Sequence, residues 1–212
     1  MRTIVVAIGL IASAGAVHAA TITQSETLSP VIIVDDGEAS TTTTIVQSGI
    51  ITEVTFTANL TSANDEIDDA GNPNDDGGDE FTDELFLFLT SPSGTAVDLV
   101  LVNTYQGSSE ADPFRFEVTF DDDAAVLVGA GSTSSPESGT FRPVGLLSDF
   151  DGEDAMGVWT VTIGDSSGSD PKSLNSFTLE IETLDASVPV PAALPLLTAG
   201  LLLIGFAGRR RG

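Results

Sequence analysis

Carboxylates are the side chains of this sequence that could do chemistry, and they are densest in residues 64–84. This segment holds ten acidic residues and no basic one. Counted from Asn72, asparagine or aspartate occupies every second position before Gly77, and Asp83 stands at position twelve. Calcium-binding loops use this spacing to present oxygen ligands. The ligands predicted on this basis are Asn72, Asn74, Asp76, Asp79 and Asp83.

The acidic segment departs from that loop pattern in two ways. Asn72 stands where aspartate is usual, and an apolar strand-like run follows where a helix is usual. A solvated acidic loop, rich in glycine and carboxylate, is therefore the alternative interpretation.

A second group of carboxylates occupies residues 149–154, where glycines also favour tight turns. It supplies three further predicted metal ligands, namely Asp149, Asp151 and Asp154. The alternative is that these side chains cap turns between strands. Both groups predict Ca²⁺ as the cofactor, because calcium prefers oxygen ligands.

The residue inventory excludes most familiar hydrolytic sites. The only histidine is His18 and there is no cysteine, so residues 19–212 can form no Ser-His-Asp triad, Cys-His pair or histidine zinc site. The single lysine, Lys172, lies in a turn-like context where it is predicted to stay solvated and protonated, which argues against a Ser-Lys dyad. Paired carboxylates for glycoside hydrolysis remain open, although one Trp and one Tyr offer little surface to a sugar. We predict that the chain is not an enzyme.

The charge distribution limits the possible partners. All 32 acidic residues lie in residues 26–185, against three basic ones there, a formal net charge of −29 for this part of the chain. Such a surface repels nucleic acid, whose phosphates require Lys and Arg. It favours cations, a salty medium or a basic partner.

The N-terminal residues 1–19 have the features of a secretory signal peptide. Arg2 precedes an apolar stretch, and Val17-His18-Ala19 provides small residues for cleavage after Ala19. Residues 20–29 are predicted to be a polar lead.

Alternating apolar residues predict short strands throughout residues 30–183. Trp159, Val161 and Ile163 alternate with threonines, and similar patterns recur at 54–60, 114–120 and 177–181. The continuous apolar run at 85–89 predicts a strand covered on both faces. No helical period occurs before residue 186, so the fold class is predicted to be all-β, a β-sandwich.

Several motifs in this region resemble the P domain (P/Homo B domain) that follows the catalytic domain of subtilisin-like proprotein convertases. They are Glu84-Leu85 leading to Ser91-Pro92-Ser93-Gly94-Thr95, then Gly139-Thr140-Phe141-Arg142-Pro143, Gly157-Val158-Trp159-Thr160 and Leu174-Asn175-Ser176-Phe177. The resemblance implies a jelly-roll sandwich over residues 30–183 and an association with serine endopeptidases. Departures are the acidic loop where the family has a His-containing link, and Phe177 where tryptophan is usual.

The C-terminal residues combine a proline-rich linker at 184–191 with an apolar stretch and an arginine tail at 192–212. The stretch is long enough to span a bilayer when counted from Val188, and the arginines favour a cytoplasmic terminus. This order resembles the PEP-CTERM class of sorting signals, which implies an exosortase-type sorting enzyme. The residues concerned are Pro189, Pro191, Ala192, Arg209, Arg210 and Arg211. A plain membrane anchor is the alternative.

Three hypotheses for function follow. The first is an exported, non-catalytic P-domain module, stabilised by calcium and displayed at the cell surface or in the extracellular matrix. The second is an accessory domain of a separate, secreted subtilisin-like protease. The third is a lectin-like binder of extracellular polysaccharide.

Overall fold

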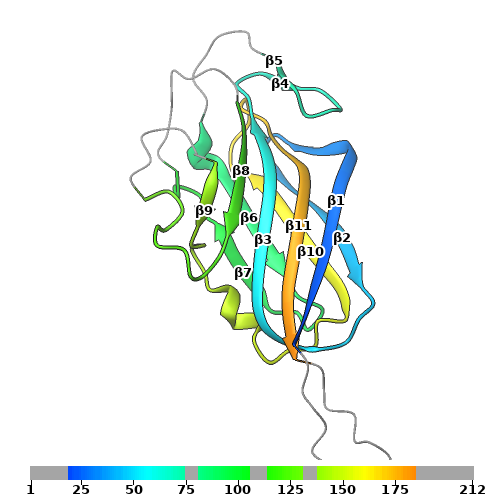
Figure 1. Cartoon of the computed structure of the whole chain (residues 1–212). Helices are drawn as coiled ribbons and strands as arrows, with labels where there is room; N and C mark the ends of the chain where they lie inside the picture. Colours follow the sequence, from blue (N-terminus) through cyan, green and yellow to red (C-terminus); the bar gives the residue numbers. More distant parts are fainter. Residues whose placement is uncertain (1–18, 75–80, 106–113, 131–137, 185–212) are drawn as a thin grey trace, which may run out of the picture. The chain divides into compact units, whose positions relative to one another are not determined.

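The computed structural model describes residues 19–74, 81–105, 114–130 and 138–184, all of which fall in one compact unit, Ala19–Leu184. Two sheets pack face to face in this unit (Figure 1). The larger has the order β1-β11-β3-β8-β9 and the smaller has the order β2-β10-β6-β7. The predicted all-β sandwich is confirmed.

All neighbouring strands of the two sheets are antiparallel except β8 and β9, which are parallel. A two-stranded ribbon, β4-β5, and two short 3-10 turns complete the described structure. The elements are β1 (Ala19–Val34), β2 (Gly37–Ile45), β3 (Ile50–Ser62), β4 (Glu66–Ile67), β5 (Pro73–Asn74), η1 (Thr82–Glu84), β6 (Leu85–Thr90), β7 (Ala96–Val100), β8 (Phe114–Phe120), β9 (Gly139–Phe141), η2 (Leu147–Phe150), β10 (Gly157–Asp165) and β11 (Lys172–Leu184).

The core lies between the two sheets and is formed by the inward residues of the alternating strands. Trp159 on β10 is fully buried, and its ring meets that of Phe150 edge-on with centroids 5.1 Å apart. Its indole N–H donates to the backbone oxygen of Ala155 at 3.0 Å. The polar atom of the largest core side chain is therefore satisfied, as burial requires.

The first strand starts earlier than the sequence indicates. Residues 20–29, predicted as a polar lead, form part of β1, which pairs with β11 from Ala19↔Leu184 to Thr27↔Ser176. The sandwich therefore extends to Ala19, at the tip where β1 starts beside the end of β11 (Figure 1). The polar residues of β1 fit an edge strand, because one face of such a strand can remain in water.

Strand β6 corrects a second prediction. The apolar run at 85–89 is not covered on both faces, since Leu85, Leu87 and Leu89 are buried while Phe86 and Phe88 are half-buried. The two phenylalanine rings lie 5.3 Å apart on the outer face. Phe86 also lies over Gly164 of β10, where no side chain separates the ring from the backbone.

No helix among the described residues is long and apolar enough to cross a membrane. The predicted signal peptide (except Ala19) and the predicted sorting segment (except Leu184) lie outside the described residues. Both stay predictions.

Candidate functional site

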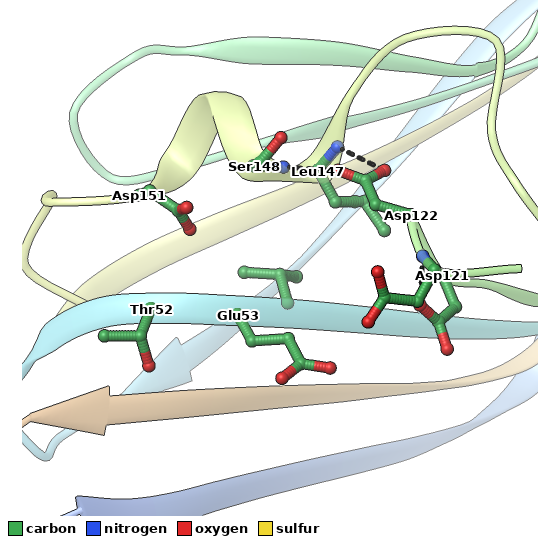
Figure 2. A pocket seen from close by; sticks show the side chains of 9 residues that line it. Thr52, Glu53, Asp121, Asp122, Leu147, Ser148 and Asp151 are labelled. Atoms are coloured by element: carbon green, nitrogen blue, oxygen red, sulfur yellow. Dashed lines mark hydrogen bonds between the residues drawn. The ribbon is translucent and has the colours of Figure 1, made fainter.

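An acidic pocket lies at the end of the sandwich where β3 begins and β8 ends (Figure 2). It has a volume of about 180 Å³. Thr52 and Glu53 of β3 form one side, and η2 with the residue that follows it forms the other (Figure 2). We call this hollow the acidic pocket, and it is lined by Thr52, Glu53, Val54, Asp121, Asp122, Asp123, Leu147, Ser148 and Asp151.

Backbone and side-chain hydrogen bonds fix the walls of the acidic pocket. The carboxylate of Asp122 accepts the backbone N–H groups of Leu147 at 3.0 Å and Ser148 at 2.8 Å, so it holds the start of η2. One oxygen of Asp121 accepts the N–H of Asp123 at 2.8 Å, which closes a turn directly after β8.

Like charges and partial burial raise two pKa values in the acidic pocket. The pKa of Glu53 is raised by burial and then by the nearby carboxylates of Glu182, Asp121 and Asp123. The pKa of Asp151 is raised by burial and by Asp122. No basic residue lines the pocket. The arrangement therefore attracts cations, since a positive charge would relieve the repulsion.

Replacement of Asp122 by alanine tests its structural role. The change leaves two backbone N–H groups without their acceptor, so we expect Asp122→Ala to lower the free energy of unfolding by about 1–2 kcal/mol. Chemical denaturation at pH 7 measures this loss. The matched variant Asp151→Asn removes a charge from the same pocket without removing an acceptor that the backbone uses, and we expect it to be neutral or slightly stabilising. Equal losses in both variants would contradict this assignment.

The predicted ligands of residues 149–154 do not gather in one place. Asp151 lines the acidic pocket, and Asp149 is exposed within η2. Asp154 instead accepts the N–H of Met156 at 3.0 Å, the hydroxyl of Ser48 at 2.9 Å and the N–H of Gly49 at 3.1 Å. These bonds, that of Met156 foremost, hold its pKa below the usual value. Asp154 thus makes the turn contacts that were the alternative interpretation of this group.

The predicted ligands of the acidic segment are also dispersed. Asn74 is exposed on β5 and Asp83 lies in η1, while Asp76 and Asp79 lie outside the described residues. The amide oxygen of Asn72 accepts from the Arg115 side chain at 3.2 Å, and its NH₂ group donates to Asp68 at 2.8 Å. Asn72 therefore already has protein partners, and calcium binding by this loop stays a prediction.

Arg115 of β8 holds the loop between β4 and β5 against the sandwich. Its guanidinium donates to the backbone oxygen of Gly71 at 2.9 Å and to that of Ala70 at 2.6 Å. Gly71 has a φ of +73°, and a Cβ there would lie 2.0 Å from the amide oxygen of Asn175. Only glycine fits this close approach.

Truncation of Arg115 should therefore release the loop without unfolding the sandwich. We expect Arg115→Ala to increase the amide hydrogen exchange of residues 65–74 by at least about tenfold, while the amides of β10 stay protected. Mass spectrometry of peptic fragments measures both regions. Arg142→Ala, which removes an arginine at another place, is the matched control and should leave residues 65–74 unchanged. Unchanged exchange in Arg115→Ala would show that other contacts hold the loop.

The pocket's main carboxylates were not predicted as a site. Asp121, Asp122 and Asp123 appear in the sequence only as a turn after an alternating strand, and Glu53 as the start of another. Their proximity depends on the pairing of β3 with β8, in which Phe56 lies opposite Phe120. A local pattern gives no signal for this juxtaposition. Among the described residues, no three acidic groups are placed to hold a metal ion by themselves.

The prediction that Lys172 stays solvated is wrong. Lys172 is 1% exposed, and its ammonium lies 3.9 Å from an oxygen of Asp165, whose side chain is also buried. It also donates to the backbone oxygen of Asp170. The lysine opens β11 on the inner face of its sheet, so its side chain enters the sandwich rather than water. Burial, opposed in part by Lys172, raises the pKa of Asp165 to about 6.

Residues 80–181 match the family model described as the proprotein convertase P-domain. The match begins just before η1 and ends within β11. It includes β6, β7 and β10 of the smaller sheet, and β8, β9 and most of β11 in the larger sheet. No curated protein sequence matches the chain at a significant level.

Three solved structures are similar to this chain at low sequence identity. One is the serine protease of Aeromonas sobria in complex with a chaperone, with 17% identity, a TM-score of 0.46 and coverage of 80% of this chain and 28% of that chain. Another structure of the serine protease of Aeromonas sobria has 16% identity and a TM-score of 0.43, with coverage of 78% of this chain and 27% of that chain. The third is the structure of FlhE, with 14% identity, a TM-score of 0.37 and coverage of 78% of this chain and 96% of that chain. The chain thus covers less than a third of the protease chains that it matches.

Proposed function

We propose that the chain is an exported, non-catalytic P-domain module that acts through binding. The observation that carries the proposal is the P-domain match over residues 80–181, a range that falls in the compact unit Ala19–Leu184. By the earlier resemblance we extend this P domain to residues 30–183 and give it jelly-roll character. Three strands outside the match complete the two sheets, since β1 and β3 pair with β11 and β2 pairs with β10.

The absence of catalysis rests on the residues available for it. Residues 19–212 contain neither histidine nor cysteine, so the usual nucleophile and base pairs cannot be assembled. The ammonium of the single lysine lies 3.9 Å from the Asp165 carboxylate, and both side chains are buried, so it is not placed to activate a nucleophile at the surface. We therefore assign the module a binding role.

Export and surface sorting form the second element of the proposal. Cleavage after Ala19 would leave Ala20 as the first residue, still paired with Thr183 in the β1–β11 ladder. The Thr183 hydroxyl donates to the backbone oxygen of Ala20 at 3.2 Å, which ties that end of the strand. Processing near Pro189, Pro191 and Ala192 by an exosortase-type enzyme would then transfer the body from the inner membrane to the cell surface or matrix.

Calcium is the third element of the proposal. The formal charge of −29 over residues 26–185 and the raised pKa values of Glu53 and Asp151 mean that this part of the chain holds carboxylates against their mutual repulsion. A divalent cation would offset this repulsion more effectively than monovalent salt. We propose that calcium stiffens the module in its extracellular setting.

A peptidase assay tests the non-catalytic assignment. The exported protein, purified from its host, is incubated with casein and with fluorogenic peptides in the presence of calcium. We expect no turnover above the level of a mock purification from cells lacking the gene. Hydrolysis that copurifies with the protein and is abolished by a serine-directed inhibitor would overturn the proposal.

An accessory role for a separate protease is the second candidate, because the matched family is named for proprotein convertases. In that case the module should slow the thermal inactivation of a secreted subtilisin-like protease that lacks its own P domain. Inactivation half-lives measured with and without equimolar module decide between the two. An unchanged half-life contradicts the accessory role and leaves the binding module described above.

A further inference from the structure

The turn that joins β10 to β11 contains an Asp–Pro peptide bond, between Asp170 and Pro171. Such a bond is easily broken for two chemical reasons. The aspartate carboxylate can close a small ring on its own carbonyl carbon, and the proline nitrogen belongs to a tertiary amide. Asp170 is 7% exposed and Pro171 is buried, whereas residues 166–169 just before them are exposed. The turn therefore places a nucleophile and its target in one residue at the border of the sandwich.

The carbonyl oxygen of this peptide bond contacts the ammonium of a buried lysine. Lys172 Nζ donates to the backbone oxygen of Asp170, and Lys172 is 1% exposed. Attack on the carbonyl carbon would place a negative charge on that oxygen. A cation that is already in contact with the oxygen, and is shielded from water, stabilises such a charge without reorganisation. The contact thus has the form of an oxyanion site.

The backbone on both sides of the Asp–Pro bond is fixed. Ser169 has a φ of +102°, which is an uncommon and strained value for a residue with a side chain. Its N–H donates to Asp35 at 2.7 Å, so the turn is held in this conformation. Beyond the bond, the oxygen of Pro171 accepts the N–H of Ala63 at 3.1 Å. Because both sides are held, a cut between Asp170 and Pro171 would release strain that the intact turn retains.

A carboxyl group suited to donate a proton lies near Asp170. Burial raises the pKa of Glu84, and the carboxylate of Asp170 raises it further, against the opposing effect of Lys172. The Oε2 atom of Glu84 is buried and has no hydrogen-bond partner among the described residues. Departure of a proline nitrogen requires a proton, and a carboxyl group with a raised pKa supplies one more readily near neutral pH.

We propose that the chain cleaves itself once, between Asp170 and Pro171. The Asp170 carboxylate attacks its own carbonyl carbon, Lys172 stabilises the charge that forms on the carbonyl oxygen, and Glu84 protonates the proline nitrogen as the C–N bond breaks. Water then opens the cyclic anhydride from the exposed side of the turn. This step restores the side-chain carboxylate, leaves a second one at the new C-terminus and returns a proton to Glu84. The sum is hydrolysis of one peptide bond.

The cut would leave β11 in its place in the larger sheet. This strand pairs with β1 on one side and with β3 on the other, and Leu174, Phe177 and Leu179 are buried in the core. The two fragments should therefore remain associated without a covalent link. The inference goes beyond the proposed function, since each chain reacts once and no other substrate is turned over. Under the proposed sorting, the cut would place a non-covalent joint between the sandwich and the C-terminal segment.

Mass spectrometry of the full chain, kept folded at pH 7 and denatured at intervals, tests the inference. The chain offers an internal reference, because a second Asp–Pro bond joins Asp112 to Pro113, outside the described residues. We expect fragments that end at Asp170 and begin at Pro171, whose masses sum to that of the chain plus one water. They should form at least about tenfold faster than those from the reference bond. In concentrated urea the two rates should become equal.

Substitutions then assign the roles. Asp170→Asn removes the nucleophile and Glu84→Gln removes the proton donor, and we expect each to slow cleavage at this bond by at least about tenfold. Asp149→Asn, at an exposed aspartate of η2, is the matched control and should cleave at the unsubstituted rate. Size-exclusion chromatography without denaturant should show that the fragments of the unsubstituted chain elute together.

Three results would overturn the inference. They are the absence of fragments ending at Asp170 from the folded chain, equal rates at the two Asp–Pro bonds in the folded chain, and undiminished cleavage in Asp170→Asn. None of them touches the non-catalytic assignment, since that assignment fails only if the protein hydrolyses added casein or peptides.

Discussion

Replacement of Lys172 by methionine is expected to destabilise the protein by about 3–5 kcal/mol at pH 8, although the two side chains are similar in size. The change removes the buried ammonium that lies 3.9 Å from Asp165 and leaves that carboxylate, which is 1% exposed, without its counter-ion. The cost comes from the uncompensated buried charge rather than from lost packing. Urea unfolding followed by tryptophan fluorescence measures it, because Trp159 is the only tryptophan and is fully buried.

The double variant Lys172→Met with Asp165→Asn separates the two causes. If the buried charge of Asp165 is responsible, the double variant should recover part of the stability that the single variant loses. A loss below about 1 kcal/mol in Lys172→Met would mean that the ion pair contributes as little as an exposed one. A loss that the double variant does not reduce would assign the effect to the other contacts of Lys172.

The second large effect is a fall in stability as the pH rises through the range in which Asp165 ionises. The pKa of Asp165 is raised from 3.8 to about 6 in the folded protein, chiefly by burial. The folded state therefore binds more protons than the unfolded state between these values, and stability decreases from pH 4 to pH 6. The contribution of this residue is at most about 3 kcal/mol, and the penalty is complete above pH 6.

Equilibrium unfolding at intervals from pH 4 to pH 8, with a chelator present, measures this dependence. Asp165→Asn has no titrating carboxylate at this position, so we expect its stability to change less between pH 4 and pH 6 than that of the unsubstituted chain. Asp154→Asn is a control with the opposite pH dependence. Hydrogen bonds lower the pKa of Asp154, so the stability that its carboxylate contributes is lost as the pH falls. Identical profiles for Asp165→Asn and the unsubstituted chain would show that Asp165 does not control this range.

The two ends of the sandwich differ in how they hold carboxylates. In the acidic pocket the carboxylates are near solvent and repel one another, and Asp122 is occupied by the backbone of η2. At the other end, the carboxylate of Asp165 is buried 3.9 Å from the ammonium of Lys172. Salt should therefore affect the first more than the second, because mobile ions screen exposed charges and reach buried ones poorly.

The strands and their inner faces can be read from the sequence alone. Trp159, Val161 and Ile163 alternate with threonine, and all three are buried, as are Phe177, Leu179 and Ile181 on β11. Hydrophobic alternation is a local signal that reports directly which face of a strand avoids water. The sequence alone also shows that residues 19–212 contain no histidine and no cysteine, which excludes the usual catalytic pairs.

Which polar residues lie next to one another depends on how the strands pair and the sheets pack. Lys172 follows Asp170 and Pro171 in a turn-like stretch, and local rules place such a lysine in water. Its burial depends instead on the register of β11 against β3 and on the position of Asp165 in the opposite sheet. The acidic pocket likewise joins Glu53, Asp122 and Asp151 through strand pairings between distant segments. The physical reason is that burial and charge proximity are set by contacts across the two sheets, which no local pattern of residues encodes.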